Sequence, residues 1–507
     1  MQMKHLLFGC ICIMGLLTGC NQAIQVARIT DTEPEIFPDY KHVTIPPNIA
    51  PLNFKLTEQE QKGNVYAVFE VESRKIAVKG RKGEFNIPAS KWRTLLADAD
   101  KGNEITVTIC RKEGSEWVGY KPFTIRIANE PVDSHLAYRL IAPGYSLWAK
   151  MGIYQRNLEN FDQSAIIENK MTGSNCMNCH SFRMQHPDEM LFHMRQTYPG
   201  TYLLRGDKIE KLNTKTGQTI SALVYPSWHP SGRFVAFTVN NTKQAFHTNH
   251  PNRIEVFDMA SDVLVYDVEK HEVFTVPELF SPDAFETFPT FSPDGKTLYF
   301  CSANAAPMPE NYEKVKYSLC SIGFDVEKRS FGTVVDTVFN ATQQDKSVSF
   351  PRVSPDGKCL LYTLSGYGNF SIWHKDADLY MMNLRTGEHY PLEAANSDDV
   401  ESYHSWSSNS RWIVFSSRRM DGLYTRPYLA YIDDDGKAHK AFLLPQKSTE
   451  FYRKLMKSYN IPEFITGKVK YQSHTIVESA KHDPGINVNF FESSQYQKAV
   501  QIENMVN

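Results

Sequence analysis

A short pattern that recurs along the second half of the chain constrains the fold more than any other feature of the sequence. It reads YPSWHPSGRFVAF from Tyr225, FPTFSPDGKTLYF from Phe288, FPRVSPDGKCLLY from Phe350 and YHSWSSNSRWIVF from Tyr403. In each copy an apolar or aromatic run enters a turn. In the copies from Phe288 and Phe350 the turn reads Ser-Pro-Asp-Gly, in which Pro fixes φ, Asp caps the turn and Gly takes a positive φ. A short apolar strand and a further predicted hairpin follow. Four-stranded units of this kind are typical of β-propeller blades, so the sequence predicts a mainly β protein.

These aromatic and Ser-Pro-Asp-Gly turns resemble the repeats of the TolB-type propeller family. The resemblance covers roughly residues 200–445, and we predict the propeller at 201–446. The complete and partial copies leave five or six blades open, and the resemblance implies six. The hairpin predicted at residues 201–217 has no inner strands beside it in the sequence, so closure of the ring requires strands from elsewhere. The fourth copy departs from the pattern at Ser408-Asn409-Ser410. A solenoid is the alternative architecture, but no capping pattern favours it.

The first twenty residues predict export and a lipid anchor. Lys4 precedes an apolar run from Leu6 to Leu17, which suits a signal peptide and is too short to span a bilayer as a helix. The run ends at Leu17-Thr18-Gly19-Cys20, which resembles the bacterial lipobox. We therefore predict a lipoprotein signal peptide at residues 1–19 and a lipid on Cys20. The body is then tethered to a bacterial membrane, in the periplasm or exposed at the surface, and which membrane holds it stays open.

Composition divides the rest of the chain into further segments. Residues 20–44 are predicted to be a Pro-containing linker, 45–130 an immunoglobulin-like β-sandwich with Trp92 and Trp117 in its core, 131–200 a mixed and partly helical segment, and 447–507 a C-terminal helix stopped by Pro462 and a tail. We expect the segment 131–200 to be an insertion that docks on the propeller at 201–446.

One motif in this insertion carries chemistry. Cys176-Met177-Asn178-Cys179-His180 is a Cys-x-x-Cys-His pentapeptide, the sequence to which c-type haem is covalently attached outside the cytoplasm. Two thiols one helical turn apart reach the two vinyl groups of the porphyrin, and His180 then becomes the proximal iron ligand. The motif predicts one covalent haem c on Cys176 and Cys179. A structural disulfide, half of a zinc site and a thioredoxin-like redox pair are the alternatives, and each lacks a companion feature.

The sixth iron ligand is predicted from the residues that follow. Residues 188–195 favour a helix after Pro187, on which Met190, His193 and Met194 share one face. We rank His193 first and Met194 second as the distal ligand, and packing of this face against neighbouring strands is the alternative. Aromatic residues available to wall a porphyrin, or to pack the joint between the sandwich and the propeller, are Tyr145, Trp148 and Tyr154.

Charge and motifs narrow the function classes. The chain has 55 Lys and Arg against 57 Asp and Glu, and no basic stripe indicates nucleic acid as a partner. Neither a nucleotide-cofactor motif nor a hydrolase motif stands out, so we predict no enzyme. Cys301 and Cys320 are expected on neighbouring strands of one blade, where a disulfide is possible. The sequence favours a lipid-anchored c-type cytochrome with protein redox partners. The alternative is a non-redox envelope propeller that binds protein or glycan, with the Cys pair as a disulfide or metal clip.

Overall fold

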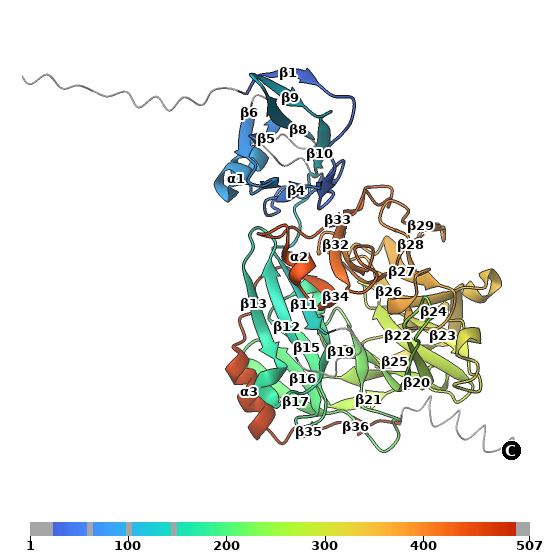
Figure 1. Ribbon diagram of the computed structural model, residues 1–507. Coiled ribbons are helices and arrows are strands. Elements are labelled where there is room, and N and C mark those ends of the chain that lie inside the picture. Colours follow the sequence, from blue (N-terminus) through green and yellow to red (C-terminus); the bar gives the residue numbers. More distant parts are fainter. Residues whose placement is uncertain (1–23, 58–63, 73, 98–103, 143–149, 493–507) are drawn as a thin grey trace, which may run out of the picture.

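The computed structural model describes residues 24–57, 64–72, 74–97, 104–142 and 150–492, which form a small N-terminal β domain and a β-propeller (Figure 1). Six sheets make up the propeller, and the innermost strands of neighbouring sheets contact one another around a closed ring. The predicted mainly β fold is confirmed, and the blade count is six. The expected signal peptide, the lipidated Cys20 and the aromatic residues Tyr145 and Trp148 lie outside the described residues.

Each blade is built on antiparallel strands that follow one another from the propeller axis outward. Blade 1 contains β34 (Ser458–Ile465), β11 (His135–Ile141), β12 (Gly152–Asn157) and β13 (Gln163–Glu168). Blade 2 contains β14 (Met177–Phe182), β15 (Glu189–Met194), β16 (Gly200–Arg205) and β17 (Lys208–Asn213). Blade 3 contains β18 (Val224–Trp228), β19 (Phe234–Phe246), β20 (Ile254–Asp267) and β21 (Glu272–Phe274).

The last three blades follow directly in the sequence. Blade 4 contains β22 (Ala284–Phe291), β23 (Thr297–Asn304), β24 (Ser318–Asp325) and β25 (Ser330–Phe339). Blade 5 contains β26 (Ser347–Val353), β27 (Cys359–Ser365), β28 (Asp378–Asn383) and β29 (His389–Pro391). Blade 6 contains β30 (Glu401–Trp406), β31 (Trp412–Ser417), β32 (Arg426–Tyr431) and β33 (Phe442–Leu443). The four copies of the sequence pattern therefore begin in the innermost strands of blades 3 to 6.

All six innermost strands carry the same local distortion. One residue in each has a φ between 45° and 55°, and these residues are Cys179, Tyr225, Phe288, Phe350, Tyr403 and Ile461. The pairing register shifts at this point in every blade, which identifies a β-bulge. The bulge brings the rings of consecutive blades into contact, with centroid distances of 4.8 Å for Tyr225 and Phe288 and 4.5 Å for Phe288 and Phe350. Phe370, from the loop after β27, packs among these rings on the propeller axis.

The predicted insertion at 131–200 is wrong, because this segment belongs to the propeller. Its first part supplies three strands of blade 1 and its second part begins blade 2. The ring closes because β34, from the C-terminal segment, pairs with β11 and becomes the innermost strand of blade 1. The expectation that the hairpin at 201–217 takes its inner strands from elsewhere in the sequence is wrong, because β14 and β15 directly precede it and complete blade 2. The blade shared between the two ends of the propeller is blade 1.

The C-terminal segment is more ordered than the predicted helix and tail. Its helices are α2 (Phe451–Lys454) and α3 (Ser473–His482), and Pro462 lies within β34 instead of ending a helix. Two short strands, β35 (Ile486–Asn487) and β36 (Asn489–Phe490), pair in parallel with the outermost strands β17 and β21. These pairings cover the outer edges of blades 2 and 3, where exposed strand edges invite association with other chains.

The N-terminal domain contains two sheets and one helix. A seven-stranded sheet is formed by β1 (Val26–Ile29), β3 (Thr44–Ile45), β5 (Val65–Val71), β6 (Arg74–Lys79), β8 (Glu104–Glu113), β9 (Glu116–Gly119) and β10 (Phe123–Ile127). A three-stranded sheet is formed by β2 (Ile36–Phe37), β4 (Phe54–Leu56) and β7 (Glu84–Phe85), and the helix is α1 (Ala89–Ala97). The predicted linker at 20–44 is wrong where it is described, because β1 pairs with β9 and β3 with β10.

One continuous hydrophobic cluster joins this domain to the propeller. It runs from Trp92 of α1, which is fully buried, to Trp412 and Leu429 of blade 6. Trp117 is only partly buried and packs against Tyr66 at the edge of the domain, so only one of the two predicted core tryptophans is in the core. Because a shared apolar core resists relative motion, the N-terminal domain is fixed to one side of the ring.

Candidate axial binding site

A cavity of about 130 Å³ lies on the propeller axis, at the end where the innermost strands finish. We call it the axial cavity. Every blade contributes to it the side chain found two residues after the residue of positive φ. These six side chains are Ser181, Ser227, Thr290, Arg352, Ser405 and Glu463. Four of these residues carry a hydroxyl group. Arg352 and Glu463 are the two charged exceptions.

Arg352 brings to this cavity a positive charge that has no ion pair within the described residues. Its carbonyl accepts a hydrogen bond from Trp406 Nε1 at 3.1 Å, but its guanidinium makes no hydrogen bond and no ion pair with any described residue. Burial lowers the pKa of the Arg352 guanidinium, and the carboxylate of Glu463 opposes that shift at longer range. A guanidinium keeps its charge in proteins, so the partly buried Arg352 is a cation with free donors.

Glu463 is the acidic group that faces the same cavity. Its Oε1 accepts a hydrogen bond from the backbone N–H of Phe182 in the next blade at 3.0 Å. Burial raises the pKa of Glu463 to about 7, against the lowering effects of the Phe182 N–H and of Arg352. The carboxyl group therefore changes its charge near neutral pH, and the net charge of the axial cavity changes with it.

His180 and His404 occupy equivalent positions beside the cavity, one residue after the residue of positive φ. The other four blades hold Pro there, at Pro226, Pro289, Pro351 and Pro462. Burial lowers the pKa of both imidazoles to about 3, so both are neutral at physiological pH. His404 Nε2 lies 3.1 Å from the carbonyl oxygen of Leu361. Neither ring nitrogen of His180 has a hydrogen-bond partner among the described residues.

The Cys-x-x-Cys-His motif occupies the innermost strand of blade 2. Aligned on its bulge, Cys179-His180-Ser181-Phe182 is a further copy of the repeat, equivalent to Tyr403-His404-Ser405-Trp406. Cys179 takes the position that is aromatic in four other blades, and Cys176 packs in the hydrophobic cluster between blades 1 and 2. Both thiols are buried and unpaired, so the predicted disulfide clip is not formed. The described residues contain no group of three His, Cys, Asp or Glu side chains able to hold a metal ion.

The predicted distal ligands lie on a strand, and the predicted helix at 188–195 is wrong. In β15, Met190 and Met194 face the cluster between blades 1 and 2, whereas His193 faces blade 3, with its ring 6.0 Å from that of Phe237. His180 instead lies against the backbone of Ile461 in blade 1. His180 and His193 are therefore on opposite faces of the blade 2 sheet. Met194 Sδ accepts a hydrogen bond from Asn175 Nδ2 at 3.8 Å.

The residues around the motif do not fit a covalent haem. The helical turn that brings two thiols to one porphyrin edge is replaced by a bulged strand, and Cys176 and Cys179 are only 8% and 4% exposed. The neutral, unpartnered His180 is suited to an iron ligand, but the axial cavity beside it is far below the ~300–1,000 Å³ of cofactor sites. His193 cannot approach the same iron from its side of the sheet. These residues therefore support no haem chemistry.

Tyr154, the described member of the predicted porphyrin wall, packs within blade 1. Its ring stacks on that of Tyr138 at 6.4 Å, and its hydroxyl donates to Glu168 Oε1 at 2.7 Å. The interpretation of this aromatic residue as structural packing is therefore the one that its contacts support.

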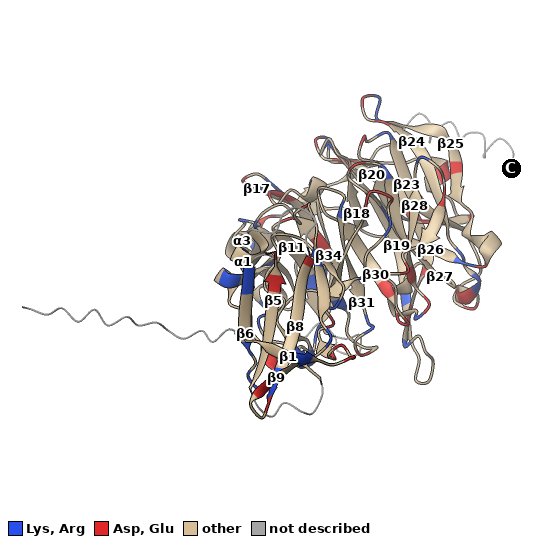
Figure 2. Ribbon diagram, turned by 90° about the horizontal axis from the view of Figure 1, so that it is seen from above, with Lys and Arg blue, Asp and Glu red and all other residues tan. Residues whose placement is uncertain are grey.

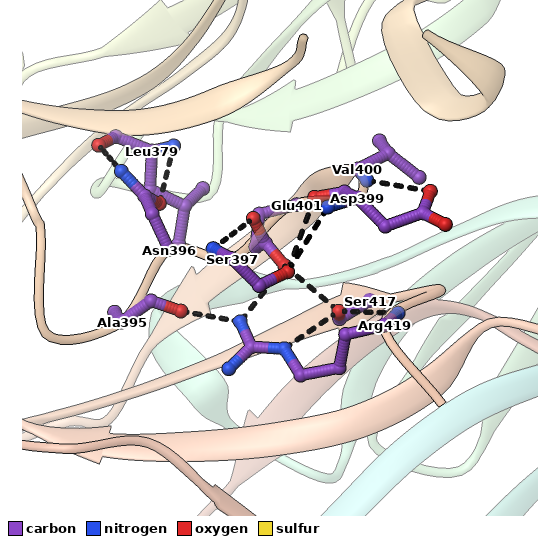
Figure 3. A network of polar contacts seen from close by, with 9 residues as sticks. All are labelled: Leu379, Ala395, Asn396, Ser397, Asp399, Val400, Glu401, Ser417 and Arg419. Carbon is purple, nitrogen blue, oxygen red and sulfur yellow. Dashed lines mark hydrogen bonds and ion pairs between the residues drawn. The ribbon is translucent and has the colours of Figure 1, made fainter. Parts of the chain in front are cut away.

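Two other buried carboxylates are held by partners within the protein. Glu401 has an exposed fraction of 0% and accepts hydrogen bonds from Ser397, Ser417 and Arg419, each within 3.0 Å (Figure 3). In the long β19–β20 hairpin, Glu255 accepts from Tyr367 at 2.7 Å and lies 2.8 Å from His374 Nε2. These contacts hold β30 to its neighbours and the hairpin to blade 5, so they explain the buried charges without a ligand.

The sequence left a disulfide between Cys301 and Cys320 possible. Cys301 pairs with Leu319, whereas Cys320 pairs with Phe300, so the two thiols face opposite sides of the blade 4 sheet and no disulfide joins them. Acidic and basic residues are interspersed over both the N-terminal domain and the propeller (Figure 2). Within the described residues, no helix has the length and apolar character needed to cross a membrane.

Comparisons with known proteins find only weak likeness to solved structures. No family model matches the chain, and no curated protein matches it. Prolyl oligopeptidase B from Galerina marginata, bound to a 35mer hydrolysis and macrocyclization substrate, is 11% identical over 78% of this chain and 54% of that chain, with a TM-score of 0.33. A prolyl endopeptidase structure is 12% identical over 76% and 50%, with a TM-score of 0.34. A GH43 endo-arabinanase from Bacillus licheniformis is 10% identical over 65% and 95%, with a TM-score of 0.29.

The chain spans about half the length of the two prolyl peptidase chains, and likeness at these scores carries no argument about activity. The candidate functional residues are therefore identified from the geometry of the axial cavity alone. Arg352 and Glu463 were missed in the sequence. The copies that begin at Tyr225, Phe288, Phe350 and Tyr403 do carry a signal for Arg352, because their third residues are Ser227, Thr290, Arg352 and Ser405. Glu463 lies in β34, which no copy of the turn follows, so no comparable signal marks it.

Proposed function

We propose that the protein is a binding propeller of the bacterial cell envelope, which holds a carboxylate of a protein partner in the axial cavity. The observation that carries this proposal is the Arg352 guanidinium, which lines the cavity without a hydrogen bond or ion pair to any described residue. Guanidinium and carboxylate form bidentate, charge-assisted hydrogen bonds, and these are among the strongest polar contacts in proteins.

The size of the cavity limits what enters it. A volume of about 130 Å³ is too small for a whole drug-sized ligand and suits a carboxylate with the few atoms next to it. The occupant is therefore the end of a larger molecule, either the C-terminal carboxylate of a polypeptide or an acidic side chain. The hydroxyl of Ser405 is buried without a partner among the described residues, so it is available as a further donor to the same group.

The location follows from the sequence. The lipobox at Cys20 and the signal peptide at 1–19 support a lipid-anchored protein whose body lies in the periplasm or at the cell surface. The resemblance of the repeats to TolB-type propellers supports a protein-binding role without catalysis. A partner that presents a carboxylate to a tethered propeller is then an envelope protein or an exported peptide.

The test uses the purified protein without its signal peptide and two pools of fluorescein-labelled short peptides. One pool ends in a free carboxylate and the other in an amide, and neither contains Asp or Glu. Fluorescence polarisation is expected to show binding of the carboxylate pool only. In the Arg352→Met variant the affinity for that pool should fall by at least about tenfold, as expected for loss of a charge-assisted hydrogen bond.

The matched control is Arg385→Met, which removes an exposed arginine from the same blade, in the turn between β28 and β29. We expect this variant to bind as the unmodified protein does. Equal binding of the amide pool, undiminished binding by Arg352→Met, or no binding of either pool would show that the axial cavity does not recognise carboxylates.

A further inference from the structure

A second, larger pocket lies between blades 2 and 3. Its volume is about 420 Å³, within the ~300–1,000 Å³ range of small-molecule sites. We call it the lateral pocket. Val224, at the start of β18, lines it, whereas Trp228, at the end of the same strand, lines the axial cavity. The two cavities therefore lie at opposite ends of one innermost strand and do not share an occupant.

The charge of the lateral pocket is one-sided. Arg195 and Lys215 line it, and both are exposed without an ion pair to any described residue. The described residues that line it include no Asp or Glu. Because nothing in the wall compensates the two cations, an anion that enters gains from both of them.

A buried histidine adds a second kind of recognition. His193 lines the pocket, is only 4% exposed, and its Nδ1 lies 2.8 Å from Thr201 Oγ1. Its Nε2 has no partner among the described residues. Burial lowers the pKa of His193 to about 3, with a smaller contribution from Arg195, so the ring is neutral. A neutral imidazole with one nitrogen already engaged offers the other as a single hydrogen-bonding group, which suits a hydroxyl.

We infer that the lateral pocket binds a small hydroxylated organic anion, such as a sugar phosphate or a sugar acid, with Arg195 and Lys215 on the anionic group and His193 Nε2 on a hydroxyl. Apolar contacts from Leu223 and Val224 form one wall, on which the carbon side of a sugar ring can lie. This site does not depend on the axial cavity. It also gives a role to His193, whose Nε2 has no partner among the described residues.

Isothermal titration calorimetry with three probes tests the inference. The probes are inorganic phosphate, glucose 6-phosphate and glucuronate, each titrated into the protein at constant ionic strength. We expect glucose 6-phosphate or glucuronate to bind more tightly than inorganic phosphate, and the better of the two identifies the anionic group. The Arg195→Gln and Lys215→Gln variants should each lose about tenfold in affinity.

Lys270→Gln, in an exposed turn of blade 3 outside the pocket, is the matched control and should bind normally. In His193→Leu, the advantage of glucose 6-phosphate over inorganic phosphate should disappear, while the affinity for phosphate itself stays the same. Because Arg195 and Lys215 are exposed, their variants remain informative if His193→Leu does not fold. Absence of binding by all three probes, or equal binding by Lys270→Gln and the Arg195 and Lys215 variants, would overturn the inference.

Discussion

Replacing Glu286 by Gln is expected to stabilise the protein at neutral pH. Glu286 lies in β22 with only 2% of its surface exposed, and its Oε2 has no hydrogen-bond partner among the described residues. Burial raises the pKa of its carboxyl group from 4.5 to about 9, and the nearby Asp262 contributes to the increase. The carboxyl group is therefore protonated in the folded protein at pH 7, but it ionises when the chain unfolds.

The magnitude follows from this difference in protonation. Below pH 4.5 the group is neutral in both states and has no effect. Above pH 4.5 the carboxyl group ionises in the unfolded state only, and the free energy of unfolding falls by about 1.4 kcal/mol for each pH unit. This fall ends near pH 9, where the folded state ionises as well. The stability contributed by the neutral carboxyl is therefore lost as pH rises from 4.5 to about 9. At pH 7 the loss is about 3 kcal/mol, and Glu286→Gln, which cannot ionise, should recover up to that amount.

Urea unfolding at pH 5 and at pH 7 measures the effect, with the tryptophan fluorescence of the propeller as the signal. The free energy of unfolding of Glu286→Gln should exceed that of the unmodified protein by less than about 1 kcal/mol at pH 5 and by up to about 3 kcal/mol at pH 7. Glu278→Gln, at an exposed site just before β22, is the control and should change it by no more than about 0.5 kcal/mol. A difference for Glu286→Gln that is the same at both pH values would refute the argument from ionisation.

Three further predictions concern the axial cavity, the aromatic rings on the axis and the Cys-x-x-Cys-His motif. Peptide carboxylates should bind about tenfold more tightly at pH 6 than at pH 8, because protonation of Glu463 leaves Arg352 uncompensated, and Glu463→Gln should bind equally at both pH values in the polarisation assay. Phe370→Ala should lower the free energy of urea unfolding by about 3–5 kcal/mol, because this ring fills the space among the aromatic residues of three blades. Protein made in a host that matures c-type cytochromes should show no mass increase from haem on Cys176 and Cys179, and a mass increase with a c-type spectrum would contradict our interpretation of the motif.

The propeller was predictable from the sequence because its turns use residues with strong local preferences. Pro, Asp and Gly at fixed positions in the copies that begin at Phe288 and Phe350 specify the turn without help from the rest of the fold. The first two blades lack that turn, and only the outer hairpin of blade 2, at 201–217, was predicted from the sequence. The strand that closes the ring, β34, was mistaken for a helix ended by Pro462, because proline normally ends a helix and is rare inside a sheet.

Residues 188–195 were predicted to be a helix because their apolar residues fit both the helical and the strand periodicity. Met190, His193 and Met194 share a helical face at spacings of three and four, but Met190, Phe192 and Met194 also alternate with Leu191 and His193 at a period of two. Short apolar runs satisfy both patterns, and tertiary pairing decides between them. In this chain β14 and β16 flank the segment on both sides, and that pairing makes it a strand.

The His180→Pro variant tests whether His180 is only a position of the blade repeat or also the ligand of a bound group. Four of the six equivalent positions hold proline, so the bulged backbone accommodates its fixed φ, and the substitution should be neutral or stabilise the protein by up to about 1 kcal/mol through the unfolded state. The control is Ser181→Pro, one residue later, where the strand pairs with Leu191 and the loss should be about 3 kcal/mol or more. Urea unfolding measures both. If His180→Pro lowered the free energy of unfolding as much as Ser181→Pro does, the imidazole of His180 would have a role beyond the blade repeat. A group bound to blade 2 would then explain the Cys-x-x-Cys-His motif better.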